Sequence, residues 1–586
     1  MMKDRLYELR VQYVRIVELL RNWHIADADC LPLFSLFVGV TVQSMLFFFG
    51  KTCSLWPMWL AWIACSAVAV AVSVKSLLKY FAIITGCLLL TAFTFSYTGT
   101  DTKCYHFAMQ FLMREGWNPV FDSTIEKFAG ISGEGIVCWP HALFMQKVTA
   151  LSGALVAKST GLWIADSFLG YLLVVTLLVL GRDFARIQWR CNHWMAWLFG
   201  LATVSSSKIT SFLAGQVDYT SYASFVIALF AGVLWHETRC GKYIVLWIMG
   251  IVLGMTSKLT GVLTGGLLMI VATWYYWRTL LFWRVSMMVV LLVFLIGAEP
   301  YLTSWIQYGS PLYPTMTFNP NVKSFELTAN DFDCNADADS MGYVARTCYA
   351  WISSALAVKV CSWLSGNPHF NPECVSPIAG LGALFRLIFV GSICLLVVSK
   401  TKKIPLVCAL VFLTLIFVPL KYVGYPRYYP QIWLIIPLSV YCFVYSGRKL
   451  PLKRYLDMAV VIGLVALTFM FDLRTLAYQG RMWVVELARQ HNYAELARDL
   501  NGSQVVVNGS FAWTFAKRLQ LAGVNACVNG NGAKLPHNDD HLLCVDAKKL
   551  ADIEHRFFVP ETPLGLLKFD WLSAFSNIPH PLFSKE

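Results

Sequence analysis

"LLKYFAIITGCLLLTAFTFSYTGTDTKCYH", residues 77–106, is the stretch that decides the fold. Residues 77–96 are mostly apolar, and a helix needs roughly 20 such residues to cross a bilayer. Polar side chains follow at once, among them Asp101, Tyr105 and His106. A carboxylate at such a boundary is either an ordinary solvated loop residue or a base held where a lipid-borne substrate arrives. The rest of the chain has to distinguish the two.

The composition assigns most of the chain to a membrane. Of the 586 residues, 57% are hydrophobic and 14% are charged, whereas soluble domains have about 25% charged residues. The 22 tryptophans fit aromatic belts that recur at many membrane crossings. The net charge of +13 comes without a nucleic-acid motif or a long basic block. The excess charge therefore favours basic loops on the cytoplasmic side over nucleic-acid binding.

Apolar segments of spanning length recur along the chain and predict about thirteen transmembrane helices. We therefore expect an all-α polytopic membrane protein. The predicted spans lie near residues 32–50, 55–73, 78–97, 165–181, 191–207, 220–236, 242–257, 261–277, 284–306, 379–399, 404–420, 428–446 and 455–473.

Basic residues are concentrated in alternate connections, which predicts a cytoplasmic N-terminus. The inner connections hold Lys75, Lys79, Arg182, Arg186, Arg190, Arg239, Lys242, Arg278, Arg284, Lys400, Lys402, Lys403, Arg448, Lys449, Lys453 and Arg454. The opposite connections hold Asp101, Asp122, Glu126, Glu134, Asp218, Glu299 and the acidic cluster at 331–339.

Three units follow from this pattern. Residues 1–31 read as a basic amphipathic helix on the cytoplasmic face. Residues 32–473 form the transmembrane domain, with large outer loops at 98–164 and 307–378. In residues 474–586, "VVVNG" and "LLCVD" read as short buried strands and "RMWVVELARQHNYAELARDL" as an amphipathic helix. We expect this last unit to be a small α/β domain on the outer side.

Five motifs lie at predicted outer positions. They are "GTDTKCYH" with "GWNPV", "WPHALFMQKVTALSG", "GQVDY", "YGSPLYP" and "YPRYYPQ", between residues 99 and 431. Their order resembles that of the GT-C superfamily of polytopic glycosyltransferases, particularly bacterial relatives of the protein mannosyltransferases and of the lipid A aminoarabinose transferase. Trp139 and His141 depart from the Tyr-Pro-Lys segment of that superfamily, and Ser310 replaces an Asn.

The resemblance implies an enzyme that transfers a sugar from a polyprenyl-phosphate carrier to an acceptor on the non-cytoplasmic face. The acceptor would be a lipid, a glycan or a protein. The enzyme would lie in a bacterial inner membrane, with its C-terminal domain in the periplasm or outside the cell. No cofactor is obligatory for this chemistry. A divalent cation has weak support, since "DFDCNADADS" at 331–340 begins like a calcium loop but has Ala336 where such a loop needs Gly.

Asp101 is the candidate general base, because inverting transfer needs one group to accept the proton of the acceptor hydroxyl. Arg427 and Tyr428, at the outer start of a predicted span, are the candidate donor-phosphate ligands, together with Lys258. Arginine offers a forked donor to phosphate oxygens. The alternative for both cations is a snorkelling side chain that only fixes the depth of its helix.

Asp218, His106, His141 and Tyr105 are candidate substrate-binding or supporting residues. Asp218 would hold the acceptor, support a metal ion or pair with Lys208. His106 would orient the base, contact phosphate or be a satisfied interface histidine.

Two other function classes stay open. An envelope glycan polymerase or ligase would share the basic phosphate site. A lipid-linked sugar transporter would place paired charges within its spans and have two related halves, whereas this sequence has no internal repeat.

Overall fold

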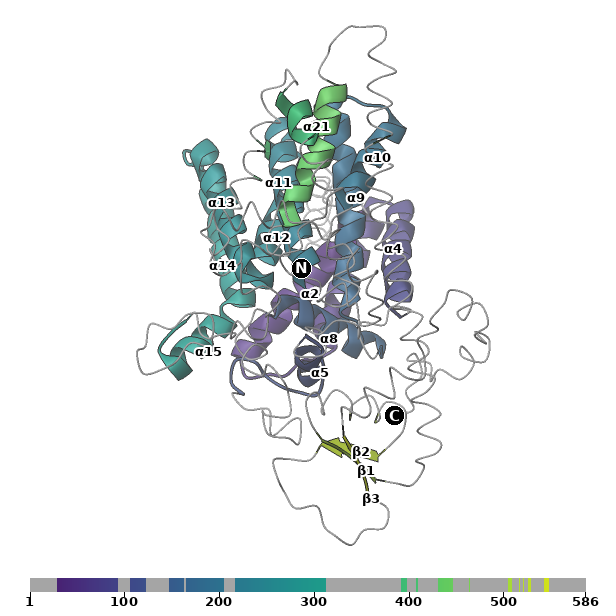
Figure 1. Cartoon of the computed structure of the whole chain (residues 1–586), viewed down its shortest axis with the longest axis vertical. Helices are drawn as coiled ribbons and strands as arrows, with labels where there is room; N and C mark the ends of the chain where they lie inside the picture. The colour runs from purple at the N-terminus through teal and green to yellow at the C-terminus, as the bar shows by residue number, and fades with distance from the viewer. Residues whose placement is uncertain are drawn as a thin grey trace, which may run out of the picture.

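The computed structural model describes part of the chain. The described residues are 29–92, 106–122, 147–162, 165–204, 217–311, 391–397, 430–445, 504–508, 525–528 and 542–546, together with isolated positions at 407–408, 411, 463, 516 and 520. Most of them form one bundle of helices, with a small sheet beyond one end (Figure 1). The predicted N-terminal amphipathic helix and the predicted spans at 404–420 and 455–473 lie almost wholly outside the described residues.

Five of the described helices are long and apolar enough to cross a membrane. They are α2 (Leu31–Phe48), α4 (Val74–Ala92), α9 (Ser167–Trp189), α11 (Val217–Thr238) and α14 (Leu280–Gly297). Further apolar helices accompany them, namely α3 (Trp56–Val72), α10 (His193–Val204), α12 (Gly241–Ser257), α13 (Leu259–Tyr276) and the pair η8 (Pro430–Leu434) and α21 (Ile435–Val444). The bundle is thus of the all-α membrane type.

The predicted span at 284–306 is wrong in one respect, because the structure has two helices there. α14 ends at Gly297, and α15 (Glu299–Tyr308) begins directly after it. Pro300 lies in the first turn of α15, a position that proline tolerates because the first N–H groups of a helix have no intrahelical partner. The acid and the proline therefore mark a new helix start within a segment that hydropathy alone reads as continuous.

α5 (Phe107–Arg114), α8 (Val148–Thr160) and α15 lie at one end of the bundle, the lower end in Figure 1. This end is named the α15 end. The connections between α11, α12, α13 and α14 are only a few residues long, so these four helices run alternately up and down. The start of α11, the α12–α13 junction and the end of α14 consequently all lie toward the α15 end.

Glycines let these helices approach closely near the α15 end. A methyl group added to Gly261 of α13 would lie 1.9 Å from the carbonyl oxygen of Gly254 of α12. One added to Gly297 of α14 would lie 2.6 Å from Cγ2 of Thr256 of α12. Small residues at such crossings are how helices pack in membranes, where the hydrophobic effect does not drive them together.

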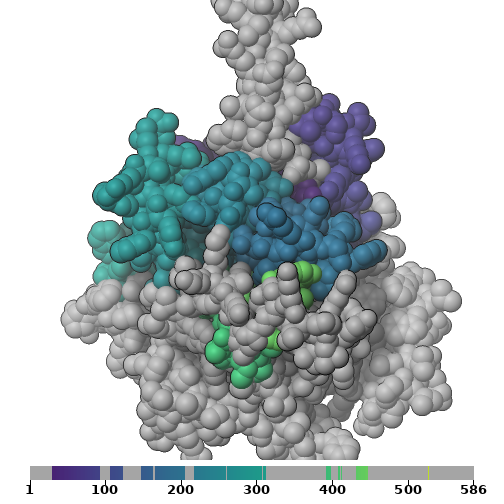
Figure 2. Space-filling view, turned by 90° about the horizontal axis from the view of Figure 1, so that it is seen from above, coloured from purple at the N-terminus to yellow at the C-terminus, as the bar shows by residue number. Residues whose placement is uncertain are grey.

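The opposite end of the bundle is held by aromatic rings. Phe184 of α9 stacks on Phe230 of α11 with 4.2 Å between ring centroids, and Phe199 of α10 meets Tyr441 of α21 edge to face at 4.8 Å. The Tyr441 hydroxyl also donates to the carbonyl oxygen of Met195 over 2.7 Å. Seen from this end, α21 (green) borders the blue helices α9 and α10 (Figure 2).

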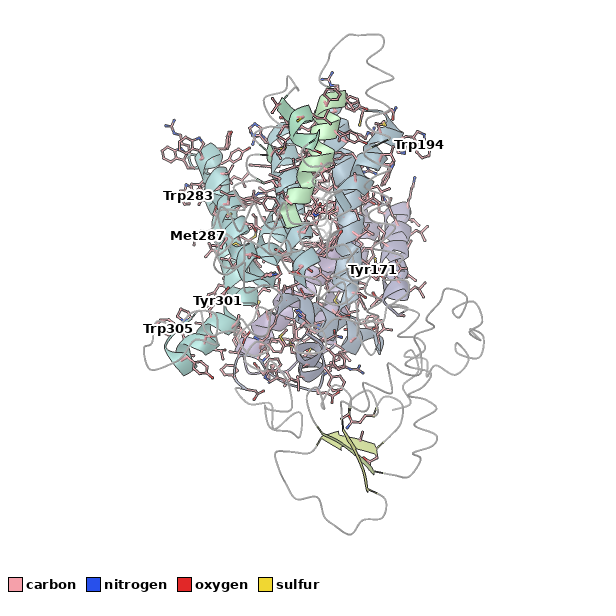
Figure 3. All side chains as sticks on the ribbon, in the orientation of Figure 1. Tyr171, Trp194, Trp283, Met287, Tyr301 and Trp305 are labelled. Atoms are coloured by element: carbon pink, nitrogen blue, oxygen red, sulfur yellow. The ribbon has the colours of Figure 1, made fainter. Side chains whose placement is uncertain are left out.

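Large apolar side chains cover the outside of the bundle. Met287 on α14 is 69% exposed and Trp305 on α15 is 62% exposed (Figure 3). Exposed tryptophans lie toward both ends: Trp305 at the α15 end, and Trp194 and Trp283 toward the opposite end (Figure 3). An apolar waist between two aromatic belts is the pattern of a lipid-facing surface.

The sheet consists of three parallel strands in the order β2-β1-β3. Its strands are β1 (Gln504–Asn508), β2 (Asn525–Val528) and β3 (Leu542–Asp546). The strands predicted from "VVVNG" and "LLCVD" are confirmed as β1 and β3, and β2 is an addition to the prediction. The sheet lies beyond the α15 end in Figure 1, while the helix predicted at 481–500 lies outside the described residues.

Candidate functional site

The structure describes three of the eight predicted site residues. Lys258, Asp218 and His106 are described, whereas Asp101, Tyr105, His141, Arg427 and Tyr428 lie outside the described residues. His106 is buried directly before the first residue of α5. Asp218 and Lys258 are brought together, although 40 residues separate them in the sequence.

Lys258 is the single residue between α12 and α13. Its backbone is extended, with φ −158° and ψ 150°, and it ends one helix and begins the next. Its carbonyl oxygen accepts hydrogen bonds from the N–H groups of Gly261 and Val262, at 2.8 and 3.2 Å. The close packing of Gly261 on Gly254 makes this abrupt reversal sterically feasible, and it projects Lys258 toward the start of α11.

The ammonium of Lys258 forms an ion pair with Oδ1 of Asp218. Asp218 lies in the first turn of α11, where a negative charge complements the positive end of the helix dipole. The side chains of Lys258 and Asp218 are 19% and 7% exposed, so both charges are largely removed from water. Lys208, the partner weighed from the sequence, lies outside the described residues.

A second buried ion pair joins Lys147 to Glu299. Nζ of Lys147 lies 2.7 Å from Oε2 of Glu299, and the two side chains are 6% and 9% exposed. The Thr303 hydroxyl lies 3.5 Å from the other carboxylate oxygen, and the Lys147 ammonium lies 5.8 Å from the centroid of the buried Trp117 ring. Lys147 directly precedes α8, and Glu299 is the first residue of α15.

The sequence interpretation missed this pair. Lys147 stands within the quoted motif at 139–153, and Glu299 was grouped with the outer acids without a role. The available signal was an acid followed by a proline at the end of an apolar span, together with a lysine at the start of the next apolar stretch.

The close approach of Gly297 to Thr256 places the two ion pairs at the same end of the bundle. Thr256 precedes Lys258 by two residues on α12, and Gly297 precedes Glu299 by two residues on α14. Because the helices touch at this point, both pairs lie at the same level of the bundle. The α15 end thus holds two ion pairs, in which Lys147, Glu299 and Asp218 are buried and Lys258 is partly buried.

Burial shifts the second pair toward its neutral form. Desolvation raises the pKa of Glu299 to about 7, although the Lys147 ammonium and the hydrogen bonds from Lys147 and Thr303 lower it. Desolvation likewise lowers the pKa of Lys147, and the Glu299 carboxylate opposes that effect. Each charge is therefore maintained largely by its partner, and a change at one member alters the protonation of the other.

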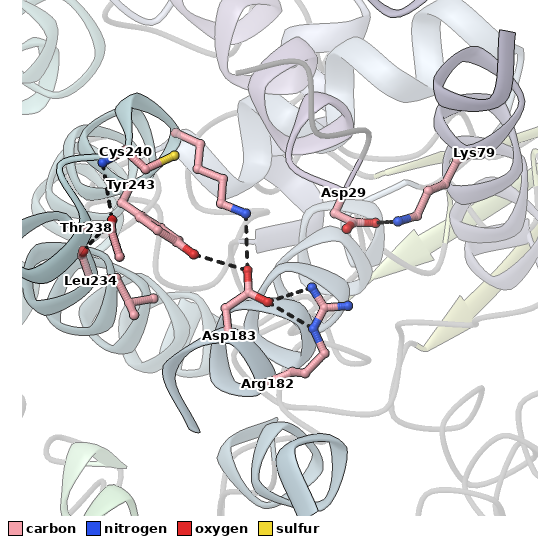
Figure 4. Close-up of polar contacts among 9 residues, drawn as sticks. Asp29, Lys79, Arg182, Asp183, Leu234, Thr238, Cys240 and Tyr243 are labelled. Carbon is pink, nitrogen blue, oxygen red and sulfur yellow. Dashed lines mark hydrogen bonds and ion pairs between the residues drawn. The ribbon is translucent and has the colours of Figure 1, made fainter. Parts of the chain in front are cut away.

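A different charged cluster occupies the opposite end of the bundle (Figure 4). Asp183 of α9 accepts from Arg182 at 2.6 Å, from Lys242 at 3.2 Å and from the Tyr243 hydroxyl at 3.3 Å. Lys79 forms an ion pair with Asp29 at the same end. These contacts tie α9 to α12 and α4 to the residues before α2, so we interpret them as structural.

No metal centre is evident in the described part of the chain, where no group of three or more His, Cys, Asp or Glu side chains is arranged to hold an ion. The acidic stretch at 331–340, for which a divalent cation was weighed, lies outside that part.

Comparison with known proteins adds no further constraint. No family model matches the chain, and neither a curated protein nor a solved structure matches it. The candidate site therefore rests on its own geometry: two buried ion pairs at one end of a bundle of membrane-spanning type.

Proposed function

We propose that the chain is an integral membrane glycosyltransferase, which transfers a sugar from a polyprenyl-phosphate carrier to an acceptor at the α15 end of the bundle. The observation that carries this proposal is the buried Asp218–Lys258 pair. Ionisable residues within the membrane are costly and usually functional. A lipid-borne anion requires such cations at the depth of the headgroups.

Asp101 is proposed as the general base. The resemblance assigns the base to the first outer loop, and Asp101 opens that loop after the span that α4 forms. Arg427 and Tyr428 are proposed as the principal donor-phosphate ligands. The pairing of Lys258 with Asp218 gives Lys258 a narrower role: it contacts phosphate only if the ligand replaces or shares the Asp218 carboxylate. Asp218 then determines how tightly Lys258 binds phosphate, because its carboxylate competes for the ammonium.

The proposal includes the finer topology. About thirteen crossings would place the α15 end, the outer loops at 98–164 and 307–378 and an α/β domain at 474–586 on the non-cytoplasmic side. The basic residues Arg182, Arg239 and Lys242 lie at the opposite end of the bundle, which agrees with a cytoplasmic location for that end. A bacterial inner membrane is the proposed location.

A lipid-linked sugar transporter is the second candidate. Paired buried charges such as Lys147 with Glu299 also occur along the substrate pathways of transporters. An envelope glycan polymerase or ligase would use the same phosphate-binding residues and differ only in its acceptor.

The decisive experiment uses purified full-length protein with a polyprenyl-phosphate sugar and an envelope-lipid acceptor, and follows product by mass spectrometry. Asp101→Asn should reduce turnover by about 10²–10⁴, the usual cost of losing a general base, while thermal unfolding stays unchanged. Asp122→Asn is the matched control, since Asp122 follows in the same loop but accepts from the Asn118 N–H group at 2.9 Å in a local turn.

Product formation by the wild type and by Asp122→Asn, together with its loss in Asp101→Asn, would support the proposal. Uptake of the lipid-linked sugar across a vesicle membrane without product would support the transporter instead. Normal turnover by Asp101→Asn would transfer the role of base to another carboxylate, of which Asp218 is the first to test.

A further inference from the structure

We propose that α11 and α13, at the end of the bundle opposite α15, form a binding site for the headgroup of an anionic membrane phospholipid, and that the Arg239 guanidinium receives its phosphate. This lipid is a component of the bilayer and not a substrate, so the site is independent of the proposed sugar transfer. Three features of Arg239 point to it: its backbone conformation, the rings around its guanidinium and the state of its charge.

The backbone of Arg239 has a conformation that favours glycine. α11 ends at Thr238, and Arg239 follows with φ 58°, while its N–H donates to the carbonyl oxygen of Trp235 over 2.9 Å. Residues in this left-handed position after a helix are usually glycine, because a Cβ atom is strained there. A bulky, charged residue at a strained position is more often functional than structural.

Aromatic rings from both helices hold the guanidinium. Its central carbon lies 5.0 Å from the centroid of the Trp235 ring of α11 and 5.6 Å from that of Tyr276, the last residue of α13. These two rings are 4.8 Å apart, and the Tyr276 hydroxyl is hydrogen-bonded to Nδ1 of His236. α11 and α13 thus build the site jointly. Stacking occupies the face of the guanidinium and leaves N–H donors at its edge for a ligand.

The charge of Arg239 differs in its surroundings from the other cations at this end. Arg182 and Lys242 both form ion pairs with Asp183. Arg239 forms no ion pair with a carboxylate in the part of the chain that the structure describes. Glu237, the nearest acid along the chain, is exposed, and its charge opposes an anion. Arg239 is therefore a positioned cation whose counter-ion has to come from outside those residues.

The location of the site selects a lipid as the source of that anion. Trp274 and Trp277, at the end of α13, are 81% and 52% exposed. Exposed tryptophans at the ends of membrane helices lie at the depth of the headgroups. Arg278, whose guanidinium carbon lies 5.0 Å from the centroid of the Trp277 ring, adds a second cation at this depth. Basic residues near a membrane surface attract anionic lipids.

A lipid bound here would connect the two helices whose other ends meet at the Asp218–Lys258 pair. Asp218 lies in the first turn of α11, and Lys258 directly precedes α13. A ligand that binds only the folded state stabilises it. The anionic lipid should therefore raise the unfolding temperature of the protein as well as bind to it.

The test is native mass spectrometry of the purified full-length protein in detergent, titrated with dioleoyl phosphatidylglycerol or dioleoyl phosphatidylcholine. The wild type should bind the anionic lipid more tightly. Arg239→Gly should lower that affinity about five- to tenfold, the effect of one cation at a membrane surface. Its unfolding temperature without lipid should stay within about 2 °C of the wild type, because glycine relieves the backbone. Tyr276→Leu keeps the charge but removes one ring, and it should lower the affinity about two- to fivefold.

Arg190→Gly is the matched control. Arg190 follows α9 with φ 49°, is exposed, and donates its N–H to the carbonyl oxygen of Arg186 over 3.0 Å, so its backbone and charge match those of Arg239. Among the described residues, no aromatic ring lies over its guanidinium. Arg190→Gly should keep the affinity within about twofold of the wild type, since exposed charges outside the site are screened.

Equal losses of affinity in Arg239→Gly and Arg190→Gly would reduce the site to diffuse surface charge and overturn it, as would equal binding of the two lipids. Soluble glycerol phosphate that binds as tightly as phosphatidylglycerol would overturn the lipid source. Phosphatidylglycerol should raise the unfolding temperature of the wild type more than that of Arg239→Gly, and an equal rise would contradict the site. If Tyr276→Leu fails to fold, the two glycine variants still decide, because their positions favour glycine.

Discussion

Lys258, the one residue between α12 and α13, forms an ion pair with Asp218 in the first turn of α11. The pair joins three helices, because Lys258 ends α12 and begins α13. It is accompanied by a second pair, Lys147 with Glu299, which joins the start of α8 to the start of α15. Charges that connect this many helices at one end of a membrane bundle set the geometry of that end.

The first prediction concerns the Asp218–Lys258 pair. Asp218→Asn and Lys258→Met should each destabilise the protein by about 1–3 kcal/mol, because each removes the opposite charge from a largely buried ion pair. The double variant should be more stable than either single one, since well-packed neutral groups often replace a buried ion pair at little cost. Thermal unfolding of the wild type, the two single variants and the double variant in detergent measures these stabilities as a double-mutant cycle.

Arg182→Met with Asp183→Asn provides a comparison at the opposite end of the bundle, where Asp183 also bonds Lys242 and Tyr243. There the double variant should remain destabilised, because Lys242 loses the negative charge with which it forms an ion pair. Strictly additive effects at Asp218 and Lys258 would contradict a direct interaction between them.

The second prediction concerns the packing that supports Lys258. Gly261→Ala should destabilise the protein by about 1–3 kcal/mol, the usual cost of overpacking, because the added methyl would lie 1.9 Å from a backbone oxygen that cannot move alone. Gly266→Ala on the same helix is the control, since nothing lies within 4 Å of its added methyl. Equal stability of the two variants would contradict the close α12–α13 contact.

Hydropathy predicted the described helices well where an apolar run was bounded by polar residues. α2, α3 and α11 lie within a few residues of the predicted spans at 32–50, 55–73 and 220–236. The pattern failed at residues 284–306, because mean hydropathy does not register one acid and one proline inside a long apolar run. The one-residue break at Lys258 depends on a glycine contact between helices, which no local pattern reveals.

The site was predicted only in part, for a related reason. Asp218 and Lys258 were identified because charged residues at the ends of apolar spans stand out in the sequence. Their pairing could not be predicted, since it depends on how α11 packs against the α12–α13 junction. Lys147 and Glu299 were missed as a pair because 152 residues separate them, and each alone resembles an ordinary boundary charge.

The third prediction concerns topology. Single cysteines at Thr100 and Gln520 should both react with a membrane-impermeant thiol reagent from the non-cytoplasmic side, and a cysteine at Arg239 only after the membrane is opened. The reason is the concentration of Lys and Arg at the end of the bundle opposite α15. The measurement requires a background in which the accessible native cysteines are replaced. Labelling of Thr100 and Gln520 variants from opposite sides would contradict both the topology and the proposed reaction.

The last prediction concerns the pH dependence of stability. Because burial raises the pKa of Glu299 to about 7, the folded state binds a proton more tightly than the unfolded state between the ordinary carboxyl pKa and that value. The stabilisation is fully present at low pH and is lost as the pH rises through about 7, by up to about 1.4 kcal/mol per pH unit. In Glu299→Gln this contribution is absent, and Lys147, whose pKa burial lowers, no longer faces the Glu299 carboxylate, so the variant loses stability as the pH falls. The stability of the wild type relative to Glu299→Gln should therefore shrink between pH 5.5 and pH 8, as measured by thermal unfolding.

Glu115→Gln, which changes an exposed carboxylate after α5, should follow the wild-type profile. A constant difference between wild type and Glu299→Gln across that range would show that Glu299 does not titrate there.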